Sequence, residues 1–139
     1  MKDNAFVDTN IFIYLHSNDE LNKKNIAISA VKQYVCFSST QVLNEFCNVF
    51  IKKYHIPNED IQTYINNIRK VCGISLITDQ TINMALKLNS RYQYHYYDCL
   101  ILASALEGNC DIILTEDMKD GQIIENRLKI VNPFMRVID

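Results

Sequence analysis

Short apolar segments alternate with amphipathic helical segments along the whole of this sequence. The spacing predicts strands over residues 5–7, 34–37, 74–77, 111–114 and 129–131. Between them, helices are predicted over residues 11–15, 22–34, 41–54, 58–72, 78–88 and 97–107. Strands that alternate with helices favour a parallel sheet covered by helices on both faces. The sequence therefore predicts an α/β fold.

Two of the predicted helices indicate where the core lies. In the helix over 41–54, the apolar residues recur at the i, i+3, i+4, i+7 spacing of a single buried stripe. The helix over 97–107 is apolar on most sides, which is typical of a helix in the middle of a fold. Gly73 is predicted to end the helix that precedes the third strand.

Length and composition indicate one globular unit. The chain has 139 residues, of which 48% are hydrophobic and 22% charged, with only three glycines and two prolines to form linkers. We therefore expect one domain over residues 1–139. The formal net charge is −2 and the pI about 5.9, so overall charge gives no support to nucleic-acid binding and counts mildly against it.

The cysteines and the N-terminus bear on the compartment. Five cysteines, an odd number without a C-x-x-C pair, mostly lie in apolar runs and are predicted to be reduced, buried thiols. The first ten residues lack the apolar stretch of a signal peptide, and no apolar run approaches the roughly 20 residues of a membrane span. We expect a cytoplasmic protein without a membrane segment.

Polar residues follow several of the predicted strands. Asp8 comes directly after the first, residues 38–40 follow the second, and Thr115 to Asp117 follow the fourth. In parallel sheets, ligands bind beyond the carboxyl ends of the strands. A functional site is therefore expected where these three places meet.

Four carboxylates stand in or beside these places, and each has an ordinary explanation when taken alone. Asp8 could cap a helix, Asp98 could stabilise the first turn of one, and Asp117 could simply belong to a loop. Glu45 lies about 60° from Val42 on the helical wheel, beside the apolar stripe. That position also suits a partly buried ion pair.

Taken together, the four carboxylates favour a metal site. Parallel topology would bring Asp8, Glu45, Asp98 and Asp117 to one edge of the sheet. Four carboxylates in one pocket repel each other unless a cation neutralises them, and oxygen ligands select hard ions such as Mg²⁺ or Mn²⁺. Such a site can activate water against a phosphodiester.

At this point the sequence resembles the PIN-domain family, specifically its short VapC-like toxins. Four motifs carry the resemblance, in the family's order and separation across nearly the whole chain. They are Phe6-Val7-Asp8-Thr9-Asn10, Asn44-Glu45, the run from Tyr97-Asp98-Cys99 to Ala105, and Leu114-Thr115-Glu116-Asp117. One departure follows Asp117, where residues 118–121 read MKDG in place of the commoner apolar-aromatic ending.

The resemblance implies a three-layer α/β/α sandwich whose central, mainly parallel sheet has four to five strands. It implies an endoribonuclease that cuts RNA with metal-activated water, with Mg²⁺ or Mn²⁺ as cofactor. Carried over by position, the catalytic and metal-binding carboxylates are Asp8, Glu45, Asp98 and Asp117, supported by Thr9, Asn10, Thr115 and Glu116. A toxin of this kind is expected to form a homodimer and to bind a small antitoxin protein. Ile61, Ile65 and Ile68 could serve such an interface, although core packing explains them equally well.

Several alternatives stay open from the sequence. Haloacid-dehalogenase-like phosphatases need a second Asp two residues after the first, where this chain has Asn10. Receiver domains need an early acidic pair and a late Lys, and neither is clear here. A catalytically silent PIN-like module that binds RNA or protein, and a housekeeping RNA-processing nuclease, remain alternatives to the toxin.

Overall fold

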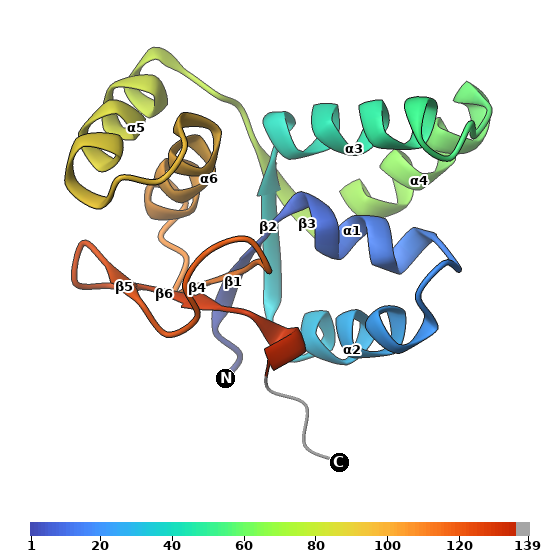
Figure 1. Ribbon diagram of the computed structural model, residues 1–139, viewed down its shortest axis with the longest axis horizontal. Helices are drawn as coiled ribbons and strands as arrows, with labels where there is room; N and C mark the ends of the chain where they lie inside the picture. The colour runs from blue at the N-terminus through green and yellow to red at the C-terminus, as the bar shows by residue number, and fades with distance from the viewer. Residues whose placement is uncertain (136–139) are drawn as a thin grey trace.

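The computed structural model describes residues 1–135 as a sheet with helices on both of its faces (Figure 1). Over these residues the sheet has six strands in the order β3-β2-β1-β4-β6-β5. The strands are β1 Asn4–Val7, β2 Val35–Ser39, β3 Cys72–Ser75, β4 Ile112–Leu114, β5 Ile123–Ile124 and β6 Leu128–Val131. The first five strands in this order form four parallel pairs, and among the described strands only β5 runs antiparallel to its neighbour, β6.

The helices form the outer layers of the predicted sandwich. They are α1 Thr9–His16, α2 Leu21–Lys32, α3 Thr40–Lys52, α4 Asn58–Val71, α5 Asp79–Tyr92 and α6 Tyr96–Glu107. In Figure 1, α5 and α6 lie on one side of β1 and β2, whereas α1 to α4 lie on the other. The predicted α/β class with a mainly parallel central sheet is confirmed.

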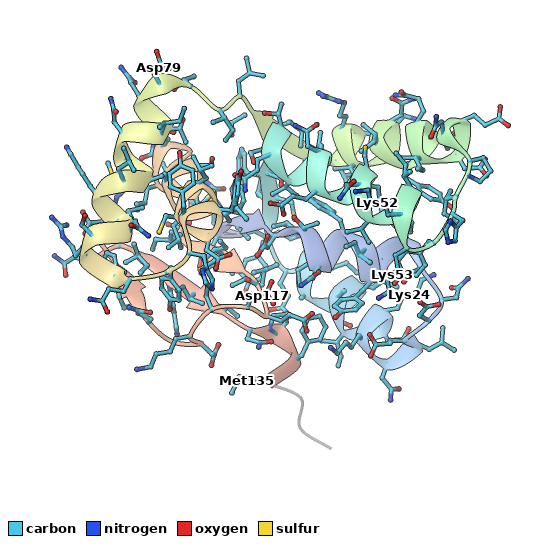
Figure 2. The ribbon with its side chains drawn as sticks, turned by 45° about the horizontal axis from the view of Figure 1, so that its top comes forward. Lys24, Lys52, Lys53, Asp79, Asp117 and Met135 are labelled. Atoms are coloured by element: carbon cyan, nitrogen blue, oxygen red, sulfur yellow. The ribbon has the colours of Figure 1, made fainter. Side chains whose placement is uncertain are left out.

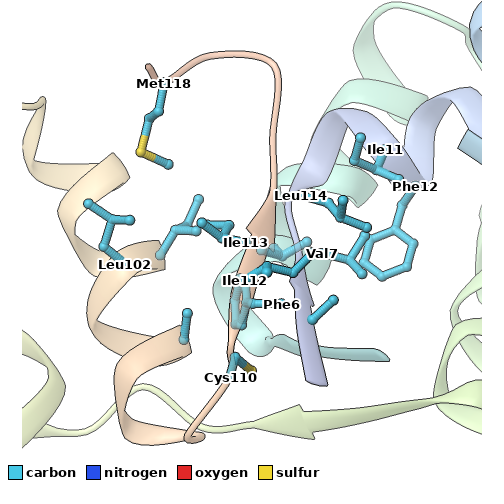
Figure 3. Close-up of a cluster of buried hydrophobic side chains, with 14 of the residues drawn as sticks. Phe6, Val7, Ile11, Phe12, Leu102, Cys110, Ile112, Ile113, Leu114 and Met118 are labelled. Atoms are coloured by element: carbon cyan, nitrogen blue, oxygen red, sulfur yellow. The ribbon is translucent and has the colours of Figure 1, made fainter. Parts of the chain in front are cut away.

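The core fills the space between the sheet and these layers. Apolar side chains of β1 and β4 are buried on both faces, as expected for central strands of a parallel sheet. Figure 3 shows Leu102 on the α6 side of β4, while Phe12 of α1 lies beside Val7 on the other face. The exposed fractions of these three side chains are 2% or less. The helix α6 is buried along most of its length, as its uniform hydrophobicity predicts.

Two details of the sheet differ from the sequence prediction. The sheet has six strands over residues 1–135 because Ile123–Ile124 pairs with β6, and a two-residue strand is too short to show alternation. Gly73 does not end a helix but lies inside β3, opposite Phe37 in the register. A Cβ at this position would stand 2.8 Å from Cδ1 of Phe37, so glycine allows the close packing of that ring.

No helix within residues 1–135 is both long enough and apolar enough to span a bilayer. All five cysteines are free thiols. Ile61 and Ile68 are buried in the monomer, at 4% and 2% exposed, so these two side chains serve core packing. The interface role considered for them from the sequence is therefore not available to them in this fold.

Candidate active site

The carboxyl-terminal edge of the sheet carries a cavity of about 290 Å³. The end of β1 and the loop after β4 meet here with the start of α1, the middle of α3 and the first half of α6. All four predicted carboxylates contribute to its wall. The lining residues are Asp8, Thr9, Asn10, Glu45, Asn48, Val49, Asp98, Ile101 and Asp117. The parallel topology has therefore brought together residues that lie up to 109 positions apart (117 − 8) in the sequence.

Asp8 is the most rigidly held member of the group. It caps α1 in an extended conformation, and its side chain is only 4% exposed. Oδ1 accepts a hydrogen bond from the Thr9 amide at 2.7 Å, and Oδ2 accepts one from the Thr115 hydroxyl at 2.8 Å. Burial raises the pKa of Asp8 to about 7, and the charges of Asp117 and Glu45 add to that rise against the lowering by its two hydrogen bonds. Near neutral pH, the Asp8 carboxyl is therefore protonated in a substantial fraction of molecules unless a cation stabilises its charge.

Glu45 projects from the first half of α3, a helix that begins after the capping residue Ser39. Its carboxylate is fixed on both sides, since Oε2 accepts from the Thr9 hydroxyl at 2.7 Å and Oε1 from Nε2 of Gln41 at 3.0 Å. Gln41 Nε2 also donates to the carbonyl of Tyr97, at 3.3 Å. The hydrogen bonds link Glu45 to α1 and bring α3 to the start of α6.

Asp98 lies in the first turn of α6 and is half-buried. Burial is the main cause of its raised pKa, and the nearby charge of Asp117 is the second. His95 lowers the pKa, and Glu45 raises it further. Its carboxylate thus stands within electrostatic reach of two other members of the group. Within residues 1–135, the Asp98 carboxylate accepts no hydrogen bond comparable to those that hold Asp8.

Asp117 follows β4 and is the most exposed of the four carboxylates. Its Oδ2 accepts from Nδ2 of Asn10 at 3.1 Å, and its backbone N–H donates to the Thr115 hydroxyl at 3.2 Å. Burial raises its pKa first, then the charges of Glu116 and Glu45, and Lys23 lowers it. In Figure 2 it is labelled near the middle of the molecule, whereas Lys24, Lys52 and Lys53 lie further out, on the side of α2 and α3.

The supporting residues divide into two groups. The side chains of Thr9, Asn10 and Thr115 each donate to one of the carboxylates: Thr9 to Glu45, Asn10 to Asp117 and Thr115 to Asp8. Glu116 points elsewhere: it accepts from the Tyr14 hydroxyl and forms an ion pair with Lys23 at 3.0 Å. Glu116 is therefore absent from the cavity wall and joins α1 and α2 to the loop after β4.

Two polar residues of the site were missed by the sequence analysis. Asn48 lines the cavity, and Gln41 orients Glu45. They lie three residues after and four residues before Glu45 in α3, so all three side chains share one helix face. The same helical-wheel argument that directed Glu45 inwards could have found both.

The donor set fits a hard divalent cation. Within residues 1–135, no three His, Cys, Asp or Glu side chains already stand close enough to form a complete metal-binding group. However, four carboxylates face one cavity, and three of them have raised pKa values because burial and mutual repulsion disfavour their charges. Oxygen ligands with uncompensated negative charge suit Mg²⁺ or Mn²⁺.

Comparison with known proteins assigns the fold to a family. The model of the PIN domain family matches residues 5–131, which is most of the chain. The chain belongs to the PIN domain family. The resemblance inferred from the four sequence motifs is thus confirmed, and the matched segment of this PIN domain contains all four carboxylates. A search of the curated proteins finds no match.

Solved structures similar to this PIN domain come from toxin–antitoxin systems. A toxin-antitoxin complex from Klebsiella pneumoniae has a TM-score of 0.69 at 24% identity, covering 93% of this chain and 97% of the other. VapBC2 from Rickettsia felis, bound to a DNA fragment from its promoter, gives 0.64 at 19%, covering 93% and 99%. VapC20 of Mycobacterium tuberculosis, a sarcin-ricin loop cleaving toxin, gives 0.64 at 16%, covering 78% and 86%. At these identities the likeness establishes a shared fold.

Proposed function

We propose that this PIN domain is a metal-dependent endoribonuclease and the toxin of a toxin–antitoxin pair. The single observation that carries the enzymatic part is the convergence of Asp8, Glu45, Asp98 and Asp117 on one cavity. These side chains come from four separate places in the chain, and two of them are fixed by hydrogen bonds that aim them at the same space. Costly, mutually repelling carboxylates clustered in this way are typical of functional sites.

Each carboxylate has a distinct part in the proposed site. Asp8 and Glu45 would be the firmly held ligands of Mg²⁺ or Mn²⁺, and Asp98 and Asp117 the less firmly held ones. When bound, the cation supplies Lewis acidity that activates water and stabilises the leaving oxygen of a phosphodiester. Thr9 and Thr115 keep the first two carboxylates in place, and Asn10 positions Asp117. On metal binding, Asp8 would release to solvent the proton that its raised pKa allows it to hold near neutral pH.

The toxin part of the proposal is supported by the neighbours in fold. Several of them are toxin–antitoxin complexes, which is why we propose an antitoxin protein as the partner of this chain, with RNA as the substrate and a homodimer as the active form. We place the protein in the cytoplasm, where its RNA substrate lies. A housekeeping RNA-processing nuclease would have the same site, and so the two functions differ in the cell and not in the chemistry.

Cleavage of RNA tests the enzymatic proposal directly. Purified protein is incubated with a mixed pool of single-stranded RNAs in Mg²⁺, in Mn²⁺ and in EDTA, beside the variants Asp8→Asn and Glu45→Gln. Asp19→Asn is the matched control, because Asp19 is an exposed carboxylate outside the cavity. We expect cleavage that needs metal, survives in the control and disappears in both site variants. Protein that neither cleaves RNA nor binds Mn²⁺ by calorimetry would be the silent binding module instead.

Growth separates the toxin from the housekeeping nuclease. Induced expression of the toxin should arrest growth of its host, and co-expression of the gene product encoded beside it should restore growth. Expression of Asp8→Asn at the same level should leave growth unaffected. Metal-dependent cleavage in vitro without growth arrest would retain the nuclease and reject the toxin.

A further inference from the structure

A pair of cysteines lies on the face of the sheet opposite α6, away from the carboxylate cavity. Cys36 belongs to β2 and Cys72 to the edge strand β3, and the two are direct partners in the parallel register. Paired residues of neighbouring strands point to the same face, and neighbouring strands lie roughly 4.7–4.9 Å apart. That spacing falls inside the range of roughly 4.4–6.8 Å between Cα atoms that a disulfide requires.

Both thiols open onto one cavity of about 270 Å³. Its wall is mostly apolar, with contributions from α1, from the end of α2 and from the end of α4. The lining residues are Phe12, Leu15, Val31, Lys32, Tyr34, Cys36, Val71 and Cys72. Cys72 is 8% exposed and Cys36 is partly buried, so a small solute reaches the pair through the cavity while bulk solvent stays largely excluded.

The contacts make the two thiols unequal. A hydrogen bond between them lowers the pKa of Cys36 and raises that of Cys72; burial opposes the first change, and the charge of Lys2 favours it. Lys2 is held near by a hydrogen bond from its Nζ to the carbonyl of Lys32, at 2.8 Å. As a thiol, Cys36 also donates weakly to the carbonyl of Val31 at 3.6 Å. A partly exposed thiol next to a cation and a hydrogen-bond donor is typical of a reactive cysteine.

We propose that Cys36 and Cys72 form a dithiol site that reacts with hydrogen peroxide and closes into an intramolecular disulfide. The Cys36 thiolate attacks one oxygen of the peroxide, the O–O bond breaks, and hydroxide leaves and takes up a proton to become water. Cys36 is then a sulfenic acid. The Cys72 thiol attacks its sulfur, the S–O bond breaks, and a second water leaves. Overall, one hydrogen peroxide oxidises two thiols to one disulfide and is reduced to two waters.

The remaining cysteines provide an internal comparison. Cys47 lies on α3, Cys99 on α6, and Cys110 just before β4, and none of the three is a register partner of another cysteine. Burial is the largest cause of a raised pKa for each of them, which disfavours their reactive thiolate form. Selectivity for one pair among five thiols is therefore the distinguishing property of the site.

The experiment counts thiols in the full chain after mild oxidation. The protein is treated with a few equivalents of hydrogen peroxide, denatured, alkylated with N-ethylmaleimide and weighed by mass spectrometry. We expect three alkylated cysteines of five, a loss of two hydrogens, and a cross-linked peptide joining Cys36 and Cys72. Cys47→Ser is the control and should close the same disulfide. Five alkylated thiols, or oxidation spread over Cys47 and Cys99, would overturn the proposal.

Two further measurements extend the test, and the second uses only wild-type protein, so that it does not depend on the folding of a variant. In Cys72→Ser, the sulfenic acid on Cys36 has no resolving thiol, and dimedone should trap it on Cys36 alone. Unoxidised wild-type protein should bind phenylarsine oxide, a reagent for neighbouring thiols, in a 1:1 ratio that prior peroxide treatment abolishes. Absence of arsenical binding to the wild type would itself contradict the pair. None of these outcomes depends on RNA cleavage, so the dithiol proposal and the proposed nuclease function are tested separately.

Discussion

The two halves of the carboxylate cavity are built differently. Asp8 and Glu45 are held from two sides each, by donors at 2.7–3.0 Å that belong to α1, α3 and the end of β4. Asp98 and Asp117 form the other half. Within residues 1–135, Asp98 accepts no comparable hydrogen bond, and Asp117 is more exposed and has a single side-chain donor at 3.1 Å. The fold fixes the positions of the Asp8 and Glu45 carboxylates, whereas the Asp98 and Asp117 carboxylates are free to change position.

This difference suggests a division of labour. Rigid ligands fix where a cation sits without reorganisation, and ordered outer partners strengthen such ligands. A more solvated half can rearrange as substrate enters and product leaves. We therefore expect changes on the Asp8 and Glu45 side to affect metal binding most, and changes on the Asp117 side to affect it less.

Removal of the Asp8 charge should have the largest effect and should change activity and stability in opposite directions. In Asp8→Asn, RNA cleavage should fall by at least about 100-fold, since a ligand is lost. The metal-free protein should nevertheless melt higher, by roughly 5 °C at pH 8, because a buried charge and its repulsion disappear. Activity assays and thermal melting in EDTA measure the two effects. A variant that melts lower would show that Asp8 stabilises the fold as an anion.

The pH dependence of stability should report the same carboxylate. Folding raises the pKa of Asp8 from 3.8 to about 7, so the folded protein binds an extra proton between these values. In EDTA, the contribution of Asp8 is fully present below pH 4 and is lost as the pH rises through 7. His16 has the opposite sign because burial lowers its pKa, and therefore the informative quantity is the difference between wild type and Asp8→Asn.

Bound metal should reverse this trend. Saturating Mn²⁺ competes with the proton on Asp8, so its stabilising effect should be greatest above pH 7 and should weaken as the pH falls. Melting curves from pH 5 to 8.5, with Mn²⁺ and with EDTA, give both slopes. A difference curve that is flat in EDTA would mean that Asp8 is ionised throughout, and the contrast between the two halves would then rest on hydrogen bonds alone.

The Thr9 hydroxyl and the Asn10 side-chain amide allow the two halves to be compared directly, because each donates to one carboxylate of a different half. Thr9→Val removes the donor to Glu45 with little change of volume, and we expect Mn²⁺ affinity to fall about 10–100-fold, as for other second partners of metal ligands. Thr9→Ser keeps the hydroxyl and should recover most of it. Asn10→Ala removes the donor to the more exposed Asp117 and should cost about fivefold or less. Calorimetry measures the Mn²⁺ affinity of the three variants. Equal losses of affinity in Thr9→Val and Asn10→Ala would contradict the distinction between the halves.

Part of this difference between the two halves could be predicted from the sequence. The position of Asp8 could be predicted because it directly follows a buried strand. The position of Glu45 could be predicted because its helix face borders the apolar stripe. The hydrogen bond from Thr9 to Glu45 could not be predicted, since it joins residues 36 positions apart whose contact depends on how α1 packs on α3. Helical periodicity gives a direction along one element, but it does not specify which donor of another element comes to meet it.

Loop residues after β4 were less predictable for a related reason. Outside a helix or strand there is no fixed period, so the sequence does not say which of Glu116 and Asp117 faces the cavity. The structure turns Asp117 inwards and Glu116 towards Tyr14 and Lys23. The unusual residues that follow also have structural roles. Met118 is buried, and the Asp120 carboxylate accepts a hydrogen bond from the backbone N–H of Asn132 at 2.8 Å.

Neutralisation of Glu116 should therefore have the smallest effect of the series. Glu116→Gln breaks the ion pair with Lys23, whose side chain is 34% exposed, and pairs of this kind contribute roughly 0–1 kcal/mol. RNA cleavage should stay within about twofold of wild type, because Glu116 does not line the cavity. Asp117→Asn, its neighbour in the chain, is the matched comparison and should lose far more activity. If the two variants lost activity equally, Glu116 would act beside Asp117 in the adjustable half, with its contact to Lys23 broken when metal or RNA binds.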